Sequence, residues 1–252
     1  MHCRVMRQWG TSVCTMATLR VGAALPDPPF NGMPGDGGLD IDLINAIGSA
    51  LGLTVELVSY GGVDFNGIFD GLNSGSYDCV IAGTTVTAAR EQEAAFAPPY
   101  LISGQSLAVN TAMHPDVRSV DDLTGLTIGV QRGNTSQPIA EELVARGKAS
   151  AVRLYPYGDI RKALDDLSSG ACDAFMKLAP VLTELVRDVT DVEVVQRGIS
   201  RESIAIAVAL GDDAMLARIA KAQAGLEADG TLQGLRRKWL GNPYVDQGLA
   251  AH

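Results

Sequence analysis

A seven-residue pattern that occurs twice constrains the fold of this 252-residue chain. Residues 72–78 read LNSGSYD and lead into the apolar run CVIAG, and residues 167–173 read LSSGACD and lead into AFMKL. Each copy is typical of a helix end, a glycine turn and a buried strand. The copies stand 95 positions apart and predict two lobes of similar build. The alternative is a chance match of turn residues.

Strands and helices alternate along the chain, which indicates an α/β fold with mostly parallel sheets flanked by helices. The strand-like run LRVGAAL (19–25) precedes an amphipathic helix at 40–52 and a second strand at 54–60. Ligand-facing loops lie at the carboxyl ends of parallel strands. We therefore expect three loops to face one another: TTVTAAR (84–90), QRGNTS (131–136) and KLAP (177–180).

Composition excludes several function classes. The net charge of −9 argues against nucleic acid or an anionic membrane as partner, because both attract clustered Lys and Arg. No apolar run approaches the ~20 residues that span a bilayer. Cys79 and Cys172 lie in apolar runs and are expected to be buried rather than bridged. No metal-ligand spacing and no nucleotide loop occurs, so we expect neither a metal nor another cofactor.

Five stretches together resemble family 3 of the bacterial extracellular (periplasmic) solute-binding proteins, the polar amino-acid binding group of ABC transporters. They extend over most of the chain from Leu19 to Gly241. Together they are specific, although each alone is a weak signal. They are LDIDLINAIGSALGL (39–53), DFNGIFDGLNSGSYDCVIAGTTVTAARE (64–91), FAPPYLISG (96–104), SVDDLTGLTIGVQRGNTS (119–136) and GLEADGTLQGLRRKWLG (225–241).

The resemblance implies a two-lobed, type II periplasmic binding protein-like fold with two hinge crossings. A ligand would bind between the lobes, which close over it by hinge bending. The expected division is an irregular leader (1–17), the first part of lobe 1 (18–107), a hinge (108–111), lobe 2 (112–198), a second hinge (199–204), the second part of lobe 1 (205–242) and a tail (243–252).

Arg90 is the residue that the resemblance assigns to the ligand carboxylate, with Thr85 and Gly83 supplying a hydroxyl and a backbone group. Arg90 begins an expected helix, where the helix dipole disfavours a cation. A guanidinium, however, presents a planar fork that fits two carboxylate oxygens. The alternative is a solvated arginine paired with an acid nearby in the sequence or structure: Glu91, Glu93 or Glu142.

The resemblance also places residues on the facing wall. Asn134 and Thr135 would complete the carboxylate clamp from lobe 2, next to backbone N–H groups at a helix start. A plain helix cap by Thr135 or Ser136 is the alternative. Phe65 matches the aromatic side chain that forms one wall of the pocket, although core packing alone would also explain it.

The sequence departs from the family pattern where an aspartate is expected to hold the ligand ammonium. Leu178 stands at that position, and a leucine cannot stabilise a buried ammonium. Its neighbour Lys177 can reach the ligand, and Asp27 lies near an acidic position that is Ala24 here. We therefore expect a carboxylate ligand without a free α-amine. In the alternative, Lys177 faces solvent or pairs with an acid, and Asp27 or another acid takes the ammonium.

The resulting hypothesis is a non-enzymatic, monomeric, exported receptor that delivers a small carboxylate to the permease of an ABC transporter. The first 17 residues lack a continuous apolar segment and make a poor signal peptide. One alternative is an enzyme similar to cyclohexadienyl (prephenate or arogenate) dehydratases, which use the same scaffold and would need a general acid in the cleft. Another is the sensory module of a larger receptor.

Overall fold

The computed structural model describes residues 5–6, 13–14 and 17–242. The two short strands β1 (Val5–Met6) and β2 (Val13–Cys14) pair antiparallel. The rest of the expected leader, apart from residue 17, and the expected tail at 243–252 lie outside the described residues.

The first lobe is built on a five-stranded sheet in the order β4-β3-β5-β14-β6. β4 and β5 pair parallel to β3, whereas β14 is antiparallel to both of its neighbours. The strands are β3 (Thr18–Ala24), β4 (Thr54–Tyr60), β5 (Cys79–Val80), β6 (Ala94–Phe96) and β14 (Ala207–Ala209). The helices are α1 (Leu39–Leu51), α2 (Asp70–Asn73), α6 (Asp213–Ala228) and α7 (Thr231–Leu240), with 3-10 turns η1 (Phe65–Phe69) and η2 (Arg90–Gln92).

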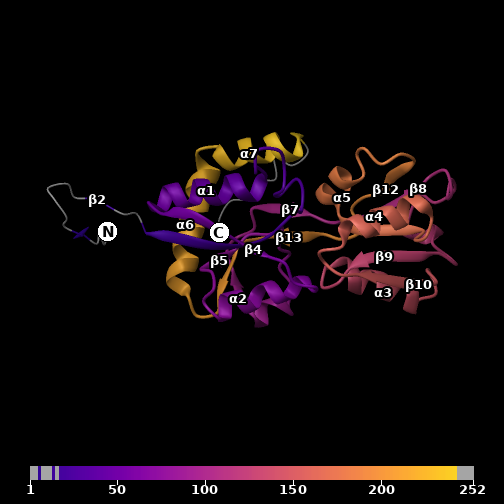
Figure 1. Cartoon of the computed structure of the whole chain (residues 1–252), viewed down its shortest axis with the longest axis horizontal. Helices are drawn as coiled ribbons and strands as arrows, with labels where there is room; N and C mark the ends of the chain where they lie inside the picture. The colour runs from indigo at the N-terminus through magenta and orange to yellow at the C-terminus, as the bar shows by residue number, and fades with distance from the viewer. Residues whose placement is uncertain (1–4, 7–12, 15–16, 243–252) are drawn as a thin grey trace.

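The second lobe repeats this arrangement in a sheet of order β10-β9-β11-β8-β12. Its strands are β8 (Gln105–Asn110), β9 (Thr127–Gln131), β10 (Ala151–Tyr155), β11 (Ala174–Leu178) and β12 (Val192–Gln196). Its helices are α3 (Ser136–Ala145), α4 (Ile160–Ser169) and α5 (Ala179–Leu185), with the 3-10 turn η3 (Val120–Asp122). Figure 1 shows the lobes side by side, with the second in orange and rose.

The repeated sequence pattern corresponds to one structural device used in both lobes, which confirms the prediction of similar build. In each copy the glycine, Gly75 or Gly170, has a positive φ of 71° or 77° and turns the chain after a helix. In each copy the final aspartate accepts a 2.8 Å hydrogen bond from the backbone of its lobe's first parallel strand: Asp78 from the Arg20 N–H, and Asp173 from the Thr127 N–H.

The lobes are joined through a two-stranded ribbon of β7 (Leu101–Ser103) and β13 (Glu202–Ile204), which lies between them in Figure 1. β8 starts at Gln105 and is already part of the second sheet. Residues 108–111, where the first hinge is expected, therefore include the end of a lobe 2 strand. The six-residue run QSLAVN is buried throughout, because β8 is flanked by β11 and β12.

Apolar side chains fill the space between each sheet and its helices. Cys79 and Cys172 are buried free thiols, as expected from their apolar surroundings. Phe30 and Tyr100 are fully buried in the cluster that α1 forms with β3 and β5. Within the part of the chain that the structure describes, no helix has the length and apolar character needed to cross a bilayer.

Candidate functional site

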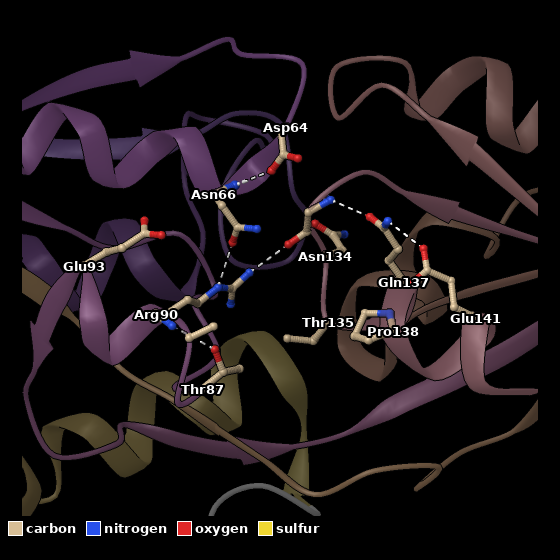
Figure 2. A pocket seen from close by; sticks show the side chains of 12 residues that line it. Asp64, Asn66, Thr87, Arg90, Glu93, Asn134, Thr135, Gln137, Pro138 and Glu141 are labelled. Carbon is tan, nitrogen blue, oxygen red and sulfur yellow. Dashed lines mark hydrogen bonds between the residues drawn. The ribbon is translucent and has the colours of Figure 1, made fainter.

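A cleft between the two lobes brings the expected site residues together. Its inner part is a cavity of about 30 Å³, and its mouth is a hollow of about 450 Å³. Arg90, Asn134 and Thr135 line both parts, and Figure 2 shows them projecting from facing walls. The inner cavity is also lined by Asp27, Phe65, Ala82, Gly83, Thr85, Gln105, Lys177 and Leu178.

The walls of the cleft touch each other. The Phe65 N–H donates to the Arg132 carbonyl at 3.1 Å, and the Tyr157 N–H donates to the Val63 carbonyl at 2.8 Å. Both bonds join a lobe 1 segment to a lobe 2 loop. The inner volume of about 30 Å³ is far below the ~300–1,000 Å³ of small-molecule sites. A ligand therefore requires the lobes to separate before it can reach the inner residues.

The Arg90 guanidinium lies at the centre of the contact between the lobes. Its Nε donates to Asn66 Oδ1 at 3.0 Å and its Nη1 to the Thr85 carbonyl at 2.9 Å, both in lobe 1. Its Nη2 donates to the Gly133 carbonyl of lobe 2 at 3.0 Å (Figure 2). The guanidinium carbon also lies 4.8 Å from the centre of the Phe65 ring, within the range of a cation–π contact.

All three acceptors of Arg90 are neutral, although the side chain is buried. The arginine is only 6% exposed, which excludes the alternative of a solvated surface residue. No carboxylate of the described residues lies within 4.0 Å of its nitrogens. Burial lowers the pKa of Arg90 to about 10, and more distant carboxylates, Glu202 foremost, oppose that shift. The site therefore contains a buried cation without a partnering anion.

Local backbone geometry places Arg90 and its lobe 2 acceptor. Arg90 begins a three-residue 3-10 turn rather than the expected helix, and its N–H donates to Thr87 Oγ1 at 3.2 Å. On the facing wall, Gly133 has a φ of 77°, and a Cβ there would stand 2.1 Å from Asp64 Oδ1. A side chain at Gly133 would therefore prevent the close approach of the two walls.

Thr85 and Thr135 face a common acceptor, the carboxylate of Glu202 in β13. Glu202 Oε2 accepts from Thr85 Oγ1 at 2.6 Å and from Thr135 Oγ1 at 2.8 Å. Glu202 Oε1 accepts from Gln105 Nε2 at 2.9 Å and from Ser200 Oγ at 2.7 Å. Thr135 makes no side-chain cap bond to α3, so its hydroxyl serves the cleft rather than the helix.

The backbone N–H of Gly83 is directed away from the cavity in this arrangement. It donates to Asp40 Oδ2 at 2.7 Å, and Tyr100 donates to the other oxygen, Oδ1, at 2.6 Å. Asp40 is fully buried at the start of α1, and burial raises its pKa to about 7. Asp40 thus fixes the loop that carries Thr85 and Arg90.

Lys177 pairs with Asp27 across the cleft. Its Nζ lies 3.1 Å from Asp27 Oδ1 and donates to Gln131 Oε1 at 2.6 Å. Lys177 is 3% exposed, so it does not face solvent. Burial raises the pKa of Asp27, and the ion pair with Lys177 opposes that shift. The cation of lobe 2 therefore has an anion of lobe 1 as its partner. Leu178, next to it, lines the same cavity.

Three residues at the site were missed by the sequence reasoning: Gln105, Glu202 and Asp40. Glu202 and Asp40 carry a signal that could have found them, because each is an acid beside an apolar run (ESIAIAVAL and LDIDLINAI). A buried carboxylate needs hydrogen-bond donors or a cation beside it, so an acid within an apolar run indicates a residue that holds other groups in place or binds a ligand. Gln105 carries no comparable signal.

Comparison with known proteins identifies a protein family that matches this chain. The family model described as "Bacterial extracellular solute-binding proteins, family 3" matches residues 19–242. The L-cystine-binding protein TcyJ of Escherichia coli (strain K12) is 29% identical over 228 residues, which are 89% of this chain and 83% of that protein. The ABC transporter arginine-binding protein 1 of the same strain is 26% identical over 235 residues, covering 88% of this chain and 90% of that protein.

Two solved structures are similar throughout most of their length. An ancestral arginine-binding protein bound to arginine superposes with a TM-score of 0.80 and 33% identity, covering 89% of this chain and 99% of that one. The ancestral amino acid-binding protein AncCDT-1, a precursor of cyclohexadienyl dehydratase, gives a TM-score of 0.78 and 30% identity, covering 88% of this chain and 95% of that one.

Proposed function

Because the chain belongs to family 3 of the bacterial extracellular solute-binding proteins, which serve amino-acid ABC transporters, we propose that it binds a small carboxylate-bearing ligand between its lobes through Arg90. The match to the family covers nearly the whole described chain. Members of the family are periplasmic, and we propose the same location here, with delivery of the ligand to a permease by a monomeric receptor.

The observation that carries this proposal is the missing anion at Arg90. The guanidinium is buried against neutral acceptors, and its burial disfavours the charged form. A ligand carboxylate would supply the anion and accept two N–H bonds from the planar fork. Each such charged hydrogen bond contributes about 1.5–3 kcal/mol. Two of them supply a large part of the ~8 kcal/mol that a micromolar dissociation constant requires.

The proposed mechanism is closure about the β7–β13 ribbon. Arg90 and Thr85 would bind the carboxylate on lobe 1, and Asn134 and Thr135 would then contact it from lobe 2. The Arg90 bond to the Gly133 carbonyl and the Lys177–Asp27 pair already join the lobes. A ligand that replaces the first of these bonds with stronger ones shifts the population towards its own closed form.

Lys177 is not a free second cation for the ligand, because Asp27 is already its partner. This pairing weakens the expectation that the ligand lacks a free α-amine, which depended on Leu178, on Ala24 and on a positive group on each wall. Relatives whose names state a ligand bind cystine, arginine or histidine, which all carry free amines. We therefore propose an amino-acid-like ligand and test both classes.

The direct test is a thermal-shift and calorimetric screen of the purified protein. One set contains the standard L-amino acids and L-cystine, and the other contains simple mono- and dicarboxylates without an amine. We expect at least one compound to raise the melting temperature and to bind with a micromolar or tighter dissociation constant. Absence of binding to every compound in both sets would refute the proposed ligand chemistry.

A further inference from the structure

The carboxylate of Glu202 is a second buried charge without a partner of opposite sign. Glu202 is 6% exposed and accepts from three hydroxyls and one amide, which are all neutral. No Lys, Arg or His nitrogen of the described residues stands within 4.0 Å of it. Arg90 and Glu202 therefore act on each other only at longer range, Glu202 being the foremost carboxylate that supports the charged form of Arg90, and neither has an oppositely charged group in direct contact.

Gln105 connects Glu202 to the inner cavity. Its Nε2 donates to Glu202 Oε1 and to Thr135 Oγ1, at 2.9 and 3.0 Å. A carboxylate only accepts hydrogen bonds, so the amide must turn its NH₂ towards Glu202 and its carbonyl the other way. Gln105 is 2% exposed and lines the cavity, and its Oε1 is buried without a hydrogen-bond partner among the described residues.

The carbonyl of Gln105 is an acceptor without a partner among the described residues, on a side chain that lines the inner cavity. Gln105 begins β8 and stands directly opposite Leu178 of β11, so the two side chains lie on the same face of the sheet. Leu178 contributes no polar group. A buried acceptor without a partner is unfavourable, so a donor that reaches it from the cavity regains the lost hydrogen bond.

We propose that Gln105 and Glu202 form a second polar subsite, which receives a positively charged hydrogen-bond donor of the ligand, such as a primary ammonium. Gln105 Oε1 accepts the donor directly, and Glu202 supplies the compensating charge behind it. A zwitterion then gives Arg90 an anion in direct contact through its carboxylate and places its amine at Gln105, near Glu202. A ligand with a carboxylate alone places a second anion near Glu202. The inference rests on the proposed function and deepens it.

The experiment compares each L-amino acid that binds with its des-amino counterpart, in which hydrogen replaces the ammonium. Dissociation constants are measured by calorimetry for the wild-type protein and for the variants Gln105→Met and Glu202→Gln. Gln223→Met is the matched control. Gln223 is also buried and also has an unpartnered Oε1, but it does not line the cavity. Binding of the des-amino acid reports whether each variant is folded.

We expect the wild-type protein to prefer the amino acid, and both cavity variants to lose about tenfold or more of the affinity for it. Affinity for the des-amino acid should change by less than about threefold, and Gln223→Met should behave as the wild type. Equal wild-type affinity for the two ligands would overturn the inference while leaving the Arg90 proposal standing. A preference for the amine that survives in Gln105→Met and Glu202→Gln would also overturn it. Failure of both ligand sets to bind would overturn the proposed function, and the inference with it.

Discussion

Replacement of Arg90 by methionine separates a binding role from a structural one. Methionine fills much of the same space but removes the charge and the hydrogen-bonding fork. Loss of one charged hydrogen bond to the ligand lowers the affinity about tenfold, and loss of two lowers it about a hundredfold or more. The affinity of Arg90→Met for any amino acid that binds the wild type should therefore fall by at least about tenfold.

The stability of the ligand-free protein should change much less, because two effects oppose each other. The shift of the Arg90 pKa from 12.5 to about 10 means that its charged form is disfavoured by about 3 kcal/mol in the folded protein. The three hydrogen bonds lost with the side chain contribute about 1.5–4.5 kcal/mol in total. The free energy of unfolding should therefore change by less than about 2 kcal/mol, or roughly 4–8 °C in melting temperature.

The assay is calorimetric titration together with differential scanning fluorimetry, with Arg132→Met as the matched control. Arg132 is an exposed arginine on the facing wall of the same cleft, so its removal changes the net charge equally. We expect wild-type affinity in the control. Equal affinities of the two variants would refute the assignment of the carboxylate to Arg90. A melting temperature that falls by far more than 8 °C in Arg90→Met alone would instead indicate a mainly structural residue.

Three further predictions concern buried charge and reactivity. Burial raises the pKa of Asp40 from 3.8 to about 7, so between these values the folded state keeps a proton that the unfolded state has lost. The free energy of unfolding should therefore fall by about 4 kcal/mol as pH rises from about 4 to 7. Chemical denaturation of Asp40→Asn over the same pH range should lack this decrease. Lys177→Met leaves Asp27 buried without its partner and should lower the free energy of unfolding by about 3–5 kcal/mol. The double variant with Asp27→Asn should recover much of this loss. A double-variant loss equal to the sum of the two single-variant losses would contradict a coupled pair. Incubation with prephenate should yield no phenylpyruvate above background, whereas product formation that Glu202→Gln abolishes would favour the dehydratase alternative.

Features that depend on neighbouring residues could be predicted from the sequence. The repeated glycine turn correctly predicted two lobes of similar build. Gly75 and Gly170 each turn the chain after a helix, and the aspartate that follows each turn accepts a hydrogen bond from the adjacent strand. The family resemblance placed Arg90 in the cleft, where the structure finds it buried. The local signal at Arg90 was misleading in one respect, since a three-residue 3-10 turn replaces the expected helix.

Features that depend on long-range pairing could not be predicted in the same way. Lys177 and Asp27 are 150 positions apart, and nothing in the residues around either one specifies the other as its partner. Gln105 bonds to Glu202, 97 positions along the chain, only because β7 and β13 pair where the chain crosses between the lobes. Both partners had to be located in space before their unused groups could be recognised.

The position of Gln105 and Glu202 near the lobe crossing indicates which residues the ligand would contact before the lobes close and which after. Arg90 belongs to lobe 1 and Thr135 to lobe 2, so the distance between them changes whenever the lobes move apart. Glu202 begins β13 and pairs with Ser103 of β7. Gln105, the first residue of β8 in lobe 2, stands two positions after Ser103, so both residues lie next to the crossing between the lobes. Residues near a hinge axis move least during closure. The proposed amine subsite would therefore persist in the open form, and the ligand would meet it together with Arg90 before lobe 2 closes. Thr135 of lobe 2, whose hydroxyl donates to Glu202 in this structure, would then stabilise the closed form rather than the first encounter with the ligand.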